Sequence, residues 1–206
     1  MRLIDLSYPL NNESPVYPGD PSLTIKKIKD YDKDGYSLNI ISTSMHVGTH
    51  VDAPSHLTEI SKTIDEYPLD CFYGRGVIIN AYGEKSIDYK KVYEDMIHPQ
   101  DCVLIYTGHD EHYPTDKYFH EHPFITKDMA HFLVNKKVKL VGIDFPSPDY
   151  PPFEIHKILL SNDIILLENV CNLEKLLGRF NFKLICFPLN IKIEASLVRA
   201  VALIDD

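Results

Sequence analysis

The chain of 206 residues has no tryptophan, only four cysteines and no excess of basic side chains. The cysteines, Cys71, Cys102, Cys171 and Cys186, form no Cys-x-x-Cys pair, so we expect reduced, mostly buried thiols. A formal net charge of −9 argues against nucleic acid or an anionic membrane as a partner. No apolar run approaches the roughly 20 residues that span a bilayer, and no signal-peptide pattern opens the chain. These absences predict a cytoplasmic protein.

Hydrophobic residues make up 44% and charged residues 25% of the chain, which is ordinary for one globular domain of this length. Short runs rich in apolar and β-branched residues predict buried strands at 76–81, 102–106, 139–145, 164–167 and 184–187, with another at 37–44. Helices are predicted at 89–96, 126–135 and 153–160, the second of them with Thr126 as its N-cap. Strands interleaved with a few helices indicate an α/β or α+β domain.

The segment His46-Val-Gly-Thr-His50-Val-Asp52-Ala-Pro-Ser-His56 gathers three histidines and an aspartate within eleven residues. The intervening β-branched residues, the glycine and the proline argue against a helix. In an extended strand, His46, Gly48, His50 and Asp52 point to one face. Gly48 would allow the bend that two imidazoles need to share one ion, and the following proline could turn His56 back over the site. The pattern predicts a metal site.

A second group of ligands is needed to complete the coordination. The segment from Asp144 to Asp149 follows a predicted strand, where loops often carry function. His156 lies near the start of a predicted helix, and Glu168 directly follows a buried apolar run. Taken alone, an exposed position is the ordinary interpretation of His156 and of Glu168.

Residues 46–56 match every fixed position of His-x-Gly-Thr-His-x-Asp-x-Pro-x-His, the hallmark of the putative cyclase family. This family contains bacterial kynurenine formamidases (arylformamidases) and isatin hydrolases. Residues 5–7, 17–20, 103–108, 141–147, 188–189 and 196–200 also resemble its conserved blocks, so the resemblance runs nearly end to end. It implies one cyclase-like metal hydrolase domain over residues 1–206, with a swivelling β/β/α-type α/β fold and a barrel-like mixed sheet. It also implies a homodimer or larger homo-oligomer.

The resemblance implies two divalent metal ions, with zinc typical of the formamidases and manganese found in related members. The ligands of these ions would be His46, His50, Asp52, His156 and Glu168. Asp52 would bridge the ions, His156 would bind the second ion, and Glu168 would contact both. His56 would be the catalytic acid and base.

Four positions depart from the family pattern. Tyr17 stands where kynurenine formamidases carry a pocket tryptophan, and His109 stands where the family commonly has another. Asn190 replaces a commonly basic residue and Leu197 a proline. These differences concern the substrate more than the metal chemistry. We expect Tyr17 to line the substrate pocket and the substrate to be a small molecule with an aromatic or similarly flat group.

The implied reaction is hydrolysis of a C–N amide bond, as in an N-formyl aryl amide, by metal-activated water. The alternatives are opening of a cyclic amide or lactone, a dehydratase or cyclase reaction at the same site, a metal-dependent binding protein, and a structural zinc site. His56 speaks against a binding protein, which needs no third histidine beside the metal. A structural zinc site is expected to have a saturated Cys/His shell instead.

Overall fold

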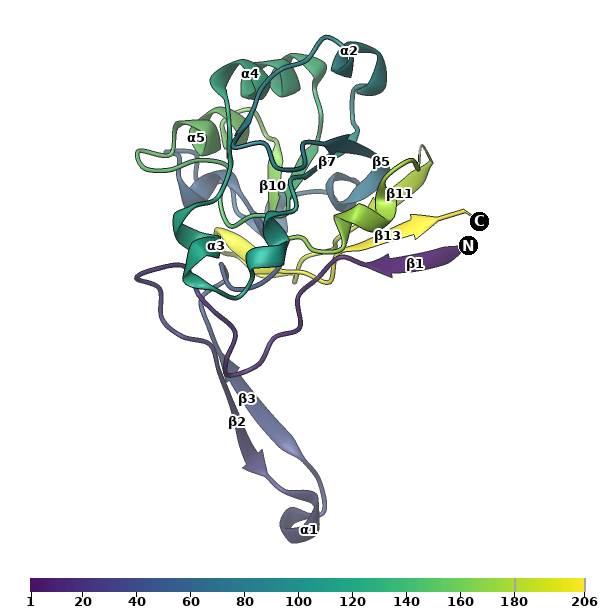
Figure 1. The fold of residues 1–206 in the computed structure, drawn as a ribbon. Helices are drawn as coiled ribbons and strands as arrows, with labels where there is room; N and C mark the ends of the chain where they lie inside the picture. The colour runs from purple at the N-terminus through teal and green to yellow at the C-terminus, as the bar shows by residue number, and fades with distance from the viewer. Residues whose placement is uncertain (180, 206) are drawn as a thin grey trace.

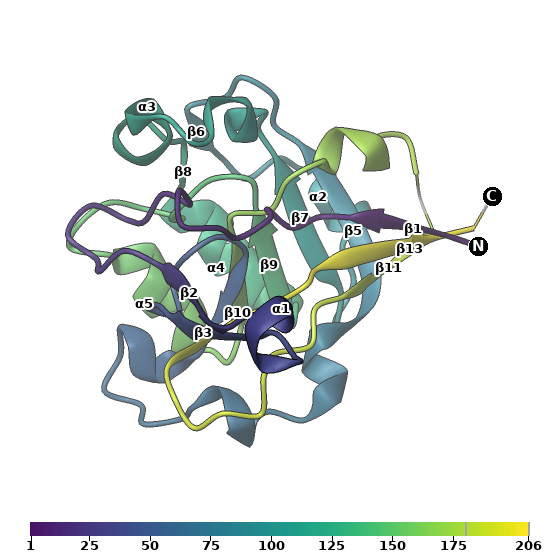
Figure 2. The same ribbon diagram turned by 90° about the horizontal axis from the view of Figure 1, so that it is seen from below.

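The computed structural model describes residues 1–179 and 181–205. Within these residues, a nine-stranded sheet has the strand order β1-β13-β11-β5-β7-β9-β10-β4-β12. The strands are β1 (Arg2–Asp5), β4 (His50–Asp52), β5 (Tyr73–Asn80), β7 (Cys102–Tyr106), β9 (Leu140–Ile143), β10 (Ile165–Glu168), β11 (Phe182–Ile185), β12 (Ala195–Leu197) and β13 (Val201–Ile204). β5, β7, β9 and β10 are parallel, and the flanking pairs are antiparallel. The sheet curls into a half-barrel (Figures 1 and 2), which confirms the predicted α/β fold with a mixed sheet.

Both faces of the central sheet are buried, which explains why its strands are continuous apolar runs. In β7, Val103 and Ile105 pack into one apolar cluster with helices α4 (Lys127–Lys136) and α5 (Glu154–Leu160). The alternate residues Cys102, Leu104 and Tyr106 pack into a second cluster on the concave face. The period-2 alternation of a strand therefore divides one run between two cores.

The predicted helices occur, with shifted ends. Thr126 caps α4 by accepting a hydrogen bond from the backbone N–H of Met129 at 3.4 Å, as predicted. Helix α5 begins at Glu154 because Phe153 adopts a left-handed backbone conformation. The helix predicted at 89–96 is too long: α2 covers only Tyr93–Met96 and buries only Tyr93. No helix among the described residues is long and apolar enough to cross a membrane.

A hairpin projects from the body of the molecule (Figure 1), and the sequence did not predict it. It consists of β2 (Thr24–Lys29) and β3 (Leu38–Ser42), with the short helix α1 (Tyr31–Asp34) at its tip. We call residues 24–42 the arm. Its aliphatic side chains do not join the core: Ile40 and Ile41 are each 53% exposed. The strand predicted at 37–44 exists as β3, and all its residues are exposed.

Candidate metal centre

The chain bends between His46 and His50, at the glycine where the sequence predicted a bend, and the extended strand covers only the second half of the motif. β4 begins only at His50, and Gly48 has φ = +57°. A Cβ atom at Gly48 would lie 2.6 Å from Cδ2 of Leu10, so the left-handed backbone favours glycine and a side chain there would displace Leu10. The bend brings the ring centroids of His46 and His50 to 5.1 Å.

The sheet places Glu168 beside the motif. β4 pairs antiparallel with β10, and His50 lies directly opposite Glu168. Nε2 of His50 is 3.4 Å from Oε2 of Glu168, and both residues are almost completely buried. Asp52, two residues along the same face of β4, has no exposed surface. Cross-strand register therefore gathers His50, Asp52 and Glu168 from distant parts of the sequence.

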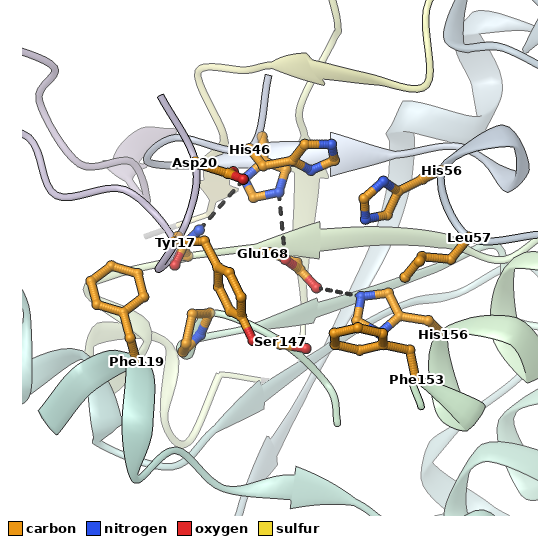
Figure 3. A pocket seen from close by; sticks show the side chains of 13 residues that line it. Tyr17, Asp20, His46, His56, Leu57, Phe119, Ser147, Phe153, His156 and Glu168 are labelled. Carbon is orange, nitrogen blue, oxygen red and sulfur yellow. Dashed lines mark hydrogen bonds and ion pairs between the residues drawn. The ribbon is translucent and has the colours of Figure 1, made fainter. Parts of the chain in front are cut away.

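A turn after β4 returns His56 to the site. Pro54–His56 forms a single 3₁₀ turn. It brings the His56 ring to 4.1 Å from the ring of His46 and 6.1 Å from that of His156, measured between centroids. In Figure 3 the His56 ring faces the same space as His46 and His156. Pro54 thus makes the turn that the sequence pattern suggested.

His156 is held between two carboxylates. It lies in the first turn of α5, where Nδ1 is 2.6 Å from Oδ1 of Asp149 and Nε2 is 3.2 Å from Oε1 of Glu168. Burial lowers the pKa of His156, but these two partners outweigh it and raise the pKa to about 10. Asp149 also accepts the backbone N–H of Ile155 at 2.6 Å. The sequence analysis identified the loop that ends at Asp149 as a candidate for function. It did not predict that Asp149 orients His156.

Three buried ligand atoms lack hydrogen-bond partners in the described part of the chain: Nε2 of His50 and both carboxylate oxygens of Asp52. Buried polar atoms are rarely left unpaired, so their convergence needs an explanation. Two sets of donor atoms, each within 4.8 Å of one another, share Asp52: His46–Asp52–His56 and His50–Asp52–Glu168. Imidazole and carboxylate donors suit zinc and related divalent ions. The residues present therefore fit a divalent metal ion.

The pKa values of the histidines near Asp52 shift in different directions. Burial alone would lower the pKa of His46, but the Asp52 carboxylate raises it to about 9. Burial opposes ionisation of Asp52, yet His46 and His50 together hold its pKa below the usual range. Burial lowers the pKa of His56, and Asp52 offsets this only in part. Burial therefore favours the neutral form of His56, which can accept a proton.

A pocket of about 160 Å³ opens onto this centre, and Tyr17 lines it together with Phe119 and Phe153 (Figure 3). The Tyr17 and Phe119 rings meet edge to face with centroids 6.3 Å apart. The ring of Phe153 stands edge-on to His156 at 5.5 Å. Of the residues predicted to bind metal, to act as acid and base or to contact substrate, all except the fully buried Asp52 line this pocket.

Some pocket residues carried no signal in the sequence. Phe119, Phe153 and Asn169 lie outside any motif that predicts ligand contact, and folding alone brings them together. His109 is not among the pocket residues. It is buried elsewhere, with Nε2 2.9 Å from the carbonyl oxygen of Tyr118, and it lines a separate cleft. His109 therefore does not take the place of a pocket tryptophan.

Two kynurenine formamidases are similar to this chain over most of its length. The protein from Bacillus cytotoxicus is 32% identical, covering 96% of this chain and 95% of the relative. That from Bacillus anthracis is 30% identical, covering 97% and 96%.

Solved structures share the fold. Isatin hydrolase A from Labrenzia aggregata, bound to benzyl benzoate, superposes with a TM-score of 0.89 at 23% identity, covering 100% of this chain and 94% of that one. A predicted metal-dependent hydrolase from Bacillus stearothermophilus gives 0.76 at 24% identity, covering 98% and 97%. The family model described as "Putative cyclase" matches residues 4–150. Given this match and relatives aligned over nearly its full length, the chain belongs to the putative cyclase family.

Proposed function

We propose that residues 1–206 form one metal-dependent hydrolase domain that cleaves a C–N amide bond in a small molecule, as an arylformamidase does. The observation that carries the proposal is the convergence of His50, Asp52 and Glu168, whose buried donor atoms lie within 4.8 Å of one another beside an open pocket. The ligands we assign are His46, His50, Asp52, His156 and Glu168. Two divalent ions, zinc or manganese, would fill the site. The similarity to kynurenine formamidases supports the amide bond as the target.

The lining of the pocket supports an aromatic substrate. Tyr17, Phe119 and Phe153 offer ring faces and edges around the site. Aromatic contacts of this kind stabilise a flat ligand by about 0.5–1.5 kcal/mol beyond its buried area. The pocket is small, which suits a single ring carrying a formamide group.

His56 is the acid and base in this proposal. When bound, the ions would supply Lewis acidity that activates water and polarises the carbonyl. Neutral His56, with its lowered pKa, takes a proton from the attacking water. It then donates that proton to the nitrogen that leaves. The His56 ring packs against the His46 ring, with centroids 4.1 Å apart.

The test combines metal analysis with assays. Protein purified without chelator should contain more than one equivalent of divalent metal, and N-formylkynurenine should be hydrolysed faster than isatin. The reverse preference would favour cyclic amide opening, and a metal-free protein with full activity would overturn the proposal. His56→Ala should keep its metal and lose at least about 100-fold in turnover, the low end for loss of an acid or base. Loss of metal from this variant would instead make His56 a ligand.

The arm supports assembly into a homodimer or larger oligomer. Ile40, Ile41 and Leu38 are 53%, 53% and 45% exposed, on a hairpin that stands clear of the body in Figure 1. Exposed aliphatic clusters of this kind mark protein contact surfaces. We assign the arm to contact with a second copy of the chain.

A further inference from the structure

Tyr118 is fully buried beside the metal centre and has one specific polar partner. It lies in helix α3 (Asp116–His120), and its hydroxyl donates to Oδ1 of Asn169 at 2.8 Å. The rings of His109 and Tyr113 pack on it at 5.3 and 5.2 Å between centroids. Burial raises the pKa of Tyr118 well above its usual value, so the phenol remains a donor. A buried hydroxyl needs such a partner, and here the partner belongs to the pocket.

Asn169 is tied to the metal motif by its side chain and its backbone. It follows Glu168 at the end of β10 and has φ = +54°, a conformation that asparagine tolerates better than most residues. Its Nδ2 donates to the carbonyl oxygen of Gly48 at 2.9 Å. Its own carbonyl oxygen accepts the hydroxyl of Thr49 at 2.6 Å. Asn169 thus fixes the bend at Gly48 that lies between His46 and His50.

The carbonyl oxygen of Gly48 also orients His50. Nδ1 of His50 lies 2.9 Å from this oxygen and donates to it, because a carbonyl can only accept. The same oxygen therefore receives two donors, one from Asn169 and one from His50. With its proton on Nδ1, His50 keeps the lone pair of Nε2 available to a metal ion, on the side where Asp52 and Glu168 lie at 3.5 and 3.4 Å. Such hydrogen bonds to the second ring nitrogen set both tautomer and ring angle of a ligand histidine.

We propose that Tyr118 and Asn169 are positioning residues that act through Gly48 to hold His50 in the tautomer that can bind metal. The inference rests on the proposed metal site. The hydrogen bond from Tyr118 fixes the Asn169 amide, the amide fixes the Gly48 carbonyl, and the carbonyl holds the Nδ1 proton. Phe119, adjacent to Tyr118 in α3, lines the pocket (Figure 3), so the same helix joins the aromatic wall to the metal ligands.

The test compares Tyr118→Phe and Asn169→Gly with Tyr113→Phe. Glycine tolerates the left-handed backbone at Asn169 while removing the amide. Tyr113 is the matched control, because its buried hydroxyl has no hydrogen-bond partner in the described chain and its ring packs against Tyr118. Zinc affinity is measured by chelator competition. The tautomer of His50 is read from imidazole ¹⁵N shifts in metal-free protein.

We expect Tyr118→Phe to weaken zinc binding about 10-fold and Asn169→Gly by up to about 100-fold, the range for residues that support a metal ligand. In both variants the His50 signal should move from the Nδ1–H form toward a mixture, and Tyr113→Phe should match the wild type in both readouts. Unchanged affinity and tautomer in folded Tyr118→Phe would overturn the inference, even if Asn169→Gly fails to fold. A wild type that binds no zinc would refute the proposed metal site, whereas the tautomer measurement would still test the relay.

Discussion

Asp149 and His156 form a buried pair in which Nδ1 of the imidazole lies 2.6 Å from Oδ1 of the carboxylate. This contact leaves Nε2 of His156 facing Glu168 across 3.2 Å. A carboxylate behind a ligand histidine fixes its ring and raises its basicity. The second half of the proposed centre therefore depends on a residue that does not itself face the ions.

Asp149→Asn should weaken metal binding about 10- to 100-fold, because the amide keeps the shape but loses the charge that supports His156. Binding stoichiometry and affinity, measured by chelator competition, would show the loss. Ser147→Ala in the same loop is the control, since its hydroxyl donates to the backbone oxygen of Asp149 rather than to the carboxylate. Equal affinities for Asp149→Asn and the wild type would contradict this role.

Asp144 should make stability depend on pH. Burial raises its pKa to about 7, although its carboxylate accepts hydrogen bonds from Thr107 and Gly108. A carboxyl with a raised pKa in the folded state holds its proton more tightly than in the unfolded chain. The free energy of unfolding should therefore fall as pH rises from about 4 to 7, by on the order of 1–4 kcal/mol in total.

The matched variant for this measurement is Asp144→Asn, which cannot ionise. Its amide oxygen can accept the two backbone N–H groups, and its nitrogen can donate to the Thr107 hydroxyl. Urea unfolding of metal-free protein between pH 4 and 8 should show the wild type losing stability relative to this variant. Parallel pH profiles for the two proteins would mean that Asp144 ionises normally in the fold.

Much of the central sheet could be predicted, because residues such as Val103, Leu104 and Ile105 form runs that are buried on both faces. The arm could not be predicted as such, because the aliphatic side chains of Ile40 and Ile41 resemble core residues in sequence while the fold leaves them exposed. The period of a pattern identifies a strand but not what covers it.

The candidate site, like the fold, could be predicted only in part. Proposed ligands that are close in sequence, such as His46 and His50, form a recognisable pattern. The partners that complete the site depend on register: Glu168 lies opposite His50 only because β10 pairs with β4. Phe119 and Asn169 come from loops and helix ends whose positions follow from packing of the whole domain. No spacing rule connects such residues before the fold is known.

Charges on the arm should break the proposed oligomer. The double variant Ile40→Asp/Ile41→Asp places two carboxylates on the exposed surface of β3, where burial against a second copy would cost several kcal/mol. Light scattering coupled to size exclusion should give the mass of a monomer, against a multiple of it for the wild type. Leu69→Asp, at a position 66% exposed outside the arm, should leave the mass unchanged. A wild type that is already monomeric would disprove the assignment.

Phe153 combines a strained backbone with a position in the pocket wall. Its φ of +60° and ψ of +46° lie in the left-handed region, which costs a residue with a side chain roughly 1–2 kcal/mol. Its ring lines the pocket edge-on to His156, so we expect the strain to be retained for substrate contact. Phe153→Gly and Phe153→Ala both delete the ring, but only glycine relieves the strain.

The glycine variant should therefore be more stable than the alanine variant by about 1 kcal/mol in urea unfolding. Both variants should raise KM for the best aromatic substrate several-fold with a smaller change in kcat, because a wall contact contributes mainly to ground-state binding. Tyr17→Ala should have a similar effect from the opposite wall. Equal stability of the two Phe153 variants would remove the strain argument. A KM unchanged from the wild type would place the substrate away from Phe153, whatever the stability result.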